Sequence, residues 1–176
     1  MSVKRSVIGL FGLLIAVVVA AFAAAPANAA TVKASAATAS VQAHVSSNGN
    51  VVLTNPSAPP GARPAVVHPD AVAPTSSPAV NVTHGAPGTT YTCDSGNLCA
   101  SVWDPTTSSY ADFRFYKCDR YYLANWFGSN GSYYDNQSSG ALSYFYGAGG
   151  NVLTSFYPQY TNIDYTWDPV YSIRNC

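Results

Sequence analysis

The four cysteines and nearly all of the large aromatic residues lie in the second half of this 176-residue chain. Residues 91–176 hold all 13 Tyr, all 3 Trp and 5 of the 7 Phe, together with every cysteine. Core-forming side chains clustered beside cysteines that can cross-link them are typical of a small domain held by disulfides. We therefore place the folded domain at residues 91–176.

The cysteines are even in number and lack the close pairs that a four-cysteine zinc site needs. They predict two disulfides among Cys93, Cys99, Cys118 and Cys176. Four cysteines allow three pairings, which sequence alone does not distinguish. Of these we favour Cys93–Cys99, which would close a turn, and Cys118–Cys176, which would tie the last residue to an inner strand.

Residues 1–29 have the layout of a secretory signal peptide. Lys4 and Arg5 precede an apolar run over 7–25, and Ala27-Asn28-Ala29 fits the small-residue cleavage pattern. We expect cleavage near Ala30, export to the extracellular space, and no membrane attachment of the mature chain.

Residues 30–90 are predicted to be a disordered linker or a pro-region. They contain no Phe, Trp or Tyr, and eight prolines fall between Pro56 and Pro87. Such a stretch cannot bury enough apolar surface to offset the entropy of ordering it. The three histidines lie here at spacings that match no metal site, so they are interpreted as solvated: His44, His68 and His84.

Within residues 91–176 the pattern is that of short β-strands. Apolar and polar residues alternate over 98–103, 113–118, 142–146 and 152–156, and a last strand is expected at 170–174. Turn residues separate these runs, which predicts an all-β antiparallel sandwich or barrel. Two hairpins form a weak internal repeat. Each is followed by an aromatic-rich segment and a polar motif, at 135–140 and at 167–172.

These motifs resemble the βγ-crystallin fold, in which two Greek keys pack as one sandwich. The likeness extends to small secreted actinobacterial proteins of that fold, including the Streptomyces metalloproteinase inhibitor family. The matching pieces are the Cys93–Cys99 opening, the strand at 98–103, the hairpin at 144–151, and the polar motifs at 135–140 and 168–174. The resemblance covers residues 91–176 and nothing upstream.

The resemblance also implies a calcium hypothesis, since the polar motifs of calcium-binding members offer oxygen ligands. Carried over, the Pro169 carbonyl would share an ion with Ser139. The second site would need a hydroxyl at Tyr171, which reaches too far, and Gly140 replaces the family's Ser. We expect no required cofactor and at most one calcium ion; the alternative is that both motifs only close the fold. The candidate residues are Ser139, Pro169, Gln137, Asp135 and Asp168.

Composition argues against an enzyme and against a nucleic-acid partner. The chain has 8 Lys+Arg and 8 Asp+Glu, and this zero formal charge gives no basic field to gather nucleic acid. Residues 91–176 contain no His and no Glu, and disulfide pairing leaves no free thiol. Nucleophile–histidine systems are thereby absent from this domain. We expect a non-enzymatic protein.

The resemblance implies a secreted protease inhibitor, with a metalloprotease as the favoured target. A rigid, disulfide-tied domain loses little entropy when a surface loop docks into a protease. We expect a monomer that uses one of two loops, at 127–134 or 157–164. The alternative is an extracellular or cell-wall module that binds calcium or glycan. The candidate inhibitory residues are Phe127, Tyr133, Tyr134, Tyr157, Tyr160 and Ile163.

Overall fold

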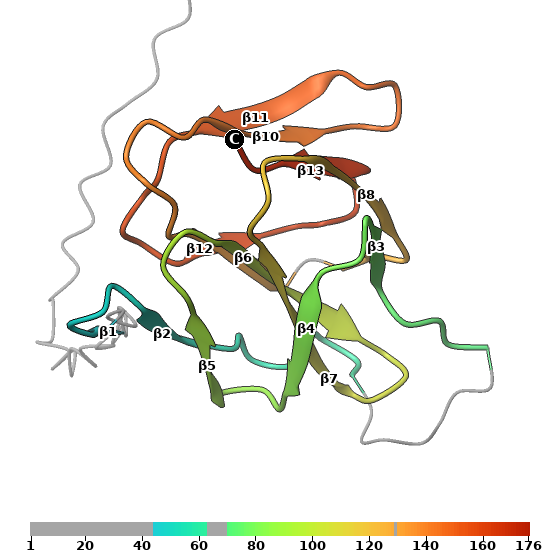
Figure 1. Cartoon of the computed structure of the whole chain (residues 1–176). Helices are drawn as coiled ribbons and strands as arrows, with labels where there is room; N and C mark the ends of the chain where they lie inside the picture. The colour runs from blue at the N-terminus through green and yellow to red at the C-terminus, as the bar shows by residue number, and fades with distance from the viewer. Residues whose placement is uncertain (1–43, 63–69, 129) are drawn as a thin grey trace, which may run out of the picture. The chain divides into compact units, whose positions relative to one another are not determined.

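The computed structural model of the chain describes residues 44–62, 70–128 and 130–176. These residues form thirteen strands and no helix, so no described helix could cross a membrane (Figure 1). The all-β class is confirmed, while the predicted signal peptide lies outside the described residues. The strands are β1 (His44–Val45), β2 (Val51–Thr54), β3 (Thr75–Ser77), β4 (Asn81–Gly85), β5 (Thr90–Cys93), β6 (Leu98–Asp104), β7 (Ser109–Phe115), β8 (Arg120–Ala124), β9 (Gly131–Asp135), β10 (Ser143–Tyr146), β11 (Val152–Phe156), β12 (Ile163–Tyr165) and β13 (Ser172–Arg174).

The strands form three antiparallel sheets. Sheet A has the order β1-β2-β5, sheet B the order β11-β10-β13-β8-β3, and sheet C the order β12-β9-β6-β7-β4. The two hairpins predicted from alternation are β6–β7 and β10–β11, and both are confirmed. Each hairpin begins a four-strand unit whose third strand joins the other unit's sheet. Strand β8 follows β7 but pairs in sheet B, and β12 follows β11 but pairs in sheet C.

Sheets B and C enclose the main hydrophobic core. Alternate residues of β6, among them Leu98, Ala100 and Val102, face Phe145 and Ile173 of sheet B. The strands of sheet C thus bury the face that the alternation predicted. Aromatic residues fill most of this space, as expected for a small domain rich in Tyr and Trp.

Trp167 lies at the centre of this core. Its ring is 4.9 Å from that of Trp126, 5.0 Å from Tyr165 and 5.4 Å from Phe145. Its indole N–H donates a 2.9 Å hydrogen bond to the Ser101 carbonyl, so the polar atom of this buried ring is satisfied.

Sheet A covers the opposite face of sheet C. Val51 and Leu53 of β2 and Tyr91 of β5 pack with Cys99 and Tyr134 of sheet C in a second buried cluster. Strands β6 and β9 are therefore buried on both faces. Strands of this kind do not show the alternation of apolar and polar residues that is typical of a sheet with one face in water.

The predicted disordered linker at 30–90 is wrong for the part that the structure describes. β2 pairs with β5, β4 pairs with β7 over five residues, and β3 pairs with β8. The folded unit thus extends well upstream of residue 91. Those small side chains of residues 44–62 and 70–90 that are buried pack against strands that the second half of the chain forms. Composition alone does not show this packing.

We predict that residues 91–176 alone are much less stable than residues 44–176. Loss of Val51 and Leu53 removes two fully buried side chains, worth about 1.5–3 kcal/mol each. Urea unfolding should show a free energy of unfolding lower by roughly 3–6 kcal/mol for the shorter fragment. Equal unfolding midpoints for the two fragments would show that the upstream strands do not support the fold.

We predict that Gly131→Ala destabilises the protein because Trp167 occupies the space of a side chain. A Cβ at Gly131 would overlap the Trp167 indole and approach the Ser101 carbonyl at 2.8 Å. The free energy of unfolding should fall by about 3 kcal/mol, the upper end for an overpacked core. The matched control is Gly149→Ala, whose Cβ would meet only Asn151 at 3.5 Å and should change little. Thermal unfolding of both variants tests this difference.

Candidate ligand-binding face

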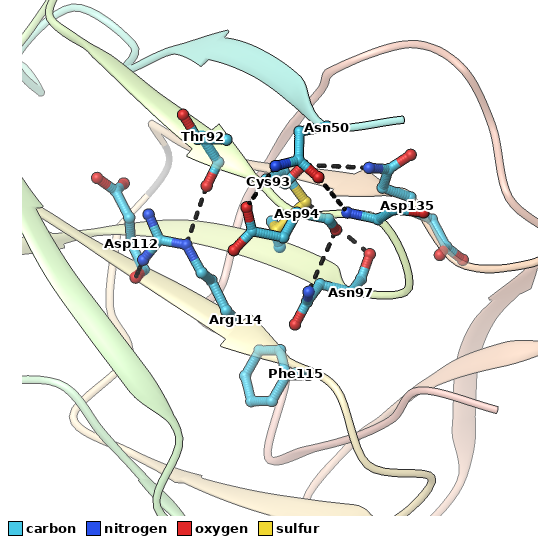
Figure 2. Close-up of a disulfide and its surroundings, with 12 residues drawn as sticks. Asn50, Thr92, Cys93, Asp94, Asn97, Asp112, Arg114, Phe115 and Asp135 are labelled. Atoms are coloured by element: carbon cyan, nitrogen blue, oxygen red, sulfur yellow. Dashed lines mark hydrogen bonds between the residues drawn. A yellow bond between two sulfur atoms is a disulfide. The ribbon is translucent and has the colours of Figure 1, made fainter. Parts of the chain in front are cut away.

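The predicted disulfide pairing is confirmed. Cys93–Cys99 links β5 to β6, and Cys118–Cys176 links the segment after β7 to the chain end. Figure 2 shows the first disulfide among hydrogen bonds that join the upstream strands to this turn. There Asn50 donates to the Asp94 carboxylate at 3.0 Å and accepts from the Ser95 N–H at 3.0 Å.

The two halves of the calcium hypothesis follow different strands, Ser139 after β9 and Pro169 after β12, and their shared site stays a prediction. Asp135, before Ser139, is at the end of β9 that pairs with Leu98. Tyr165, before Pro169, pairs with Gly131 at the other end of that strand. Four residues of strand separate these ends by about 13 Å.

The motif carboxylates already have local partners. Asp135 accepts hydrogen bonds from Gln137 and from the Ser143 hydroxyl, although burial outweighs them and raises the pKa of this carboxyl. Asp168 accepts a 2.8 Å hydrogen bond from the Gly128 N–H. Within the described ranges no three His, Cys, Asp or Glu side chains form a metal-sized cluster.

Of the candidate inhibitory residues, Tyr133 and Tyr134 do not lie on a loop. Both belong to β9 and are buried, Tyr133 against the main core and Tyr134 under sheet A. Their placement at a protease-facing loop is therefore wrong, because a central strand covered on both faces shows no exposed side. Ile163 begins β12 and is half-buried against the main core.

The other three inhibitory candidates are exposed. Phe127 follows β8, while Tyr157 and Tyr160 lie on the segment that connects β11 to β12. Tyr160 exposes 75% of its surface, more than any other described large apolar or aromatic side chain. The β11–β12 segment therefore remains a candidate contact loop.

The outer face of sheet B carries a row of tyrosines that sequence patterning did not assign to a site. Phe145 and Ile173 point into the core, so their neighbours on β10 and β13 point outward. We call the outward set the tyrosine face. It consists of Arg120, Tyr122, Tyr144, Tyr146 and Arg174.

The rings of the tyrosine face are held in a fixed arrangement. Tyr144 and Tyr146 stack at 5.8 Å with 23° between their planes. The Arg120 guanidinium lies 4.1 Å from the Tyr146 ring centre and 5.7 Å from that of Tyr122. Its Nε donates to the Ser172 hydroxyl at 3.0 Å, which fixes the cation between the two rings.

A shallow hollow of about 260 Å³ adjoins this face; its lining is Tyr146, Arg120 and Arg174 together with Cys118 and Asp119. Parallel rings next to guanidinium groups can stack on a flat ligand and hydrogen-bond its anionic groups. In the sequence, the alternation Tyr-Phe-Tyr at 144–146 was the signal that could have indicated this face. It does not tell which rings point outward, because that depends on which face of sheet B packs against the core.

A second polar arrangement is buried beneath sheet A, where the sequence predicted only a linker. Ser101 and Asp112 are register partners on the outer face of sheet C, and Asn55 after β2 contacts both. Burial raises the pKa of the Asp112 carboxyl to about 6, an effect that the Ser101 and Asn55 side chains partly offset. His84, which the sequence predicted to be solvated, is exposed, and its Nε2 also lies 3.1 Å from the buried Asp104 carboxylate.

Comparison of the chain with protein-family models, with curated proteins and with solved structures returns no match.

Proposed function

We propose that this chain is a secreted, non-catalytic binding protein whose ligand lies on the tyrosine face of sheet B. The observation that carries the proposal is the parallel pair Tyr144–Tyr146 beside the ordered Arg120. Two disulfides agree with an oxidising, extracellular location. Binding of this kind requires no cofactor.

The ligand class that fits best is an anionic polysaccharide. Sugar rings present flat apolar faces that can stack on tyrosine rings, as in other sites built from aromatic side chains and a few polar groups. The charged members of the tyrosine face are both cationic, Arg120 and Arg174. Guanidinium groups match the planar carboxylates of uronic acids in a bidentate geometry.

We predict that the protein binds an oligogalacturonate in calorimetric titration and binds a neutral oligosaccharide of the same length more weakly. Tyr144→Ala should weaken binding by about tenfold, or about 1.4 kcal/mol, because one stacking ring is lost. Arg174→Gln should reduce the preference for the charged ligand. Tyr116→Ala is the matched control, since Tyr116 is 70% exposed and directly follows β7, which belongs to sheet C. Binding that is absent, or unchanged by Tyr144→Ala, would contradict the proposal.

We also propose that β6–β9 and β10–β13 are two Greek keys of the βγ-crystallin kind. The exchange of the third strand between the two sheets supports this assignment. The resemblance in the cysteine opening and the hairpins points the same way. This assignment concerns the fold and leaves the ligand open.

A second candidate function is inhibition of a secreted metalloprotease by the β11–β12 loop. The specific observation is that this loop presents Tyr157 and Tyr160 between two strands fixed in different sheets. β11 pairs with β10 in sheet B, and β12 pairs with β9 in sheet C. Loop ends held in this way limit the entropy lost on docking.

We predict for this candidate that the purified protein inhibits a thermolysin-like zinc protease more strongly than subtilisin-like or trypsin-like enzymes. Tyr160→Ala should weaken inhibition by roughly 30-fold, equivalent to about 2 kcal/mol at an interface hot spot. Tyr122→Ala, another exposed tyrosine on a different surface, should leave inhibition unchanged. Absence of inhibition at micromolar protein would remove this candidate and leave the glycan proposal intact.

A further inference from the structure

Three side chains from distant parts of the chain meet beneath sheet A. Asn55 follows β2, Ser101 lies on β6 and Asp112 lies on β7. Their exposed fractions are 2%, 0% and 1%, so water is excluded from all three. They are also chemically complementary, because they provide a hydroxyl, a carboxamide and a carboxyl group.

The Asn55 side-chain amide lies between the other two groups. The Ser101 hydroxyl donates to Asn55 Oδ1 at 2.8 Å, and Asn55 Nδ2 donates to Asp112 Oδ2 at 3.4 Å. With a C=O bond of about 1.2 Å, the Ser101 oxygen lies roughly 3–4 Å from the amide carbon. A near-attack geometry needs about 3–3.5 Å between the reacting atoms and aligned orbitals. The hydrogen bond holds the two groups at about this distance, and the Ser101 hydroxyl must turn from Oδ1 toward Cγ to attack.

The surroundings hold this arrangement in place. The Asn55 N–H donates to the Thr89 carbonyl at 2.9 Å, and its own carbonyl accepts from the Gly88 N–H at 3.1 Å. A Cβ at Gly85 would lie 2.5 Å from Asn55 Nδ2, so glycine makes room for the amide. Among the described residues, Asp112 Oδ1 has no hydrogen-bond partner, which leaves it able to accept a proton.

We propose that Asn55 and Ser101 react to form an intramolecular ester bond between Asn55 Cγ and Ser101 Oγ. The bond that forms is Cγ–Oγ and the bond that breaks is Cγ–Nδ2. The hydroxyl proton of Ser101 passes to the Asp112 carboxylate and from there to the departing nitrogen, which leaves as ammonia. Carboxamide and alcohol become ester and ammonia, Asp112 is regenerated, and no oxidant or other reactant is needed.

Asp112 is suited to this transfer by its position and by its environment. Its carboxyl interacts with the side chains of both Ser101 and Asn55, so both ends of the proton path are within its reach. Burial raises the pKa of its carboxyl to about 6, near neutral pH, where one group can both accept and donate a proton. The covering strands β2 and β5 exclude the water that would hydrolyse the product.

The bond would act as a third covalent cross-link. It would join the segment after β2 to the central strand β6, which neither disulfide does. The proposal does not depend on the ligand of the tyrosine face, which belongs to sheet B.

The test is mass spectrometry of the purified protein, with its N-terminus determined, together with peptide mapping. We expect a mass lower by one ammonia than that of the same chain with two disulfides, and one cross-linked peptide pair that contains Asn55 and Ser101. Mild hydroxylamine treatment should separate the pair. A mass equal to that of the disulfide-bonded sequence overturns the proposal, whatever the variants do.

The variants distinguish this ester from other losses of ammonia. Ser101→Ala and Asp112→Asn should both restore the full mass, whereas Ser132→Ala should keep the deficit. Ser132 is the matched control because it is a buried hydroxyl and the register partner of Ser101 on β9. A deficit that persists in Ser101→Ala would place the loss elsewhere, for example at the Asn48-Gly49 sequence, and would overturn the proposal.

Discussion

Burial of the central strands of sheet C, β6, β7 and β9, on both faces is the constraint on which the rest of the structure depends. Its inner face meets sheet B through Leu98 and Phe113, and its outer face meets sheet A through Cys99 and Tyr134. A sheet covered on one side can keep its polar residues in water, whereas this one cannot. The polar residues of its outer face therefore need partners inside the protein, and Asn55 supplies them for Ser101.

In sheet B, by contrast, the residues that alternate with the core residues face solvent. No described strand packs over its outer face, so Tyr122 stays exposed and Tyr146 is organised by Arg120 instead of by a covering layer. The two faces thus favour different chemistry. An open face with ordered rings suits reversible binding, while a dry and crowded one can promote a reaction between neighbouring side chains.

The hairpins and the Cys93–Cys99 disulfide could be predicted because their signals are local. Alternation marks β6–β7 and β10–β11, and the short Cys93–Cys99 loop favours a turn. The placement of Tyr133 and Tyr134 on a loop at 127–134 failed for a different reason. It depended on where β9 lies, and the continuous burial of β9 removes the alternation that would have identified this strand.

The sequence by itself determined the all-β class and the two hairpins, because they follow from local alternation. The four cysteines also indicated two disulfides, but the structure decided which of the three possible pairings forms. Only the tertiary structure decided that residues 44–62 and 70–90 fold with the rest. Their small side chains offer too little apolar surface to order alone, and they become ordered against a sheet built by later residues. The same long-range pairing decides which face keeps its tyrosines in water and which three side chains meet at Asn55.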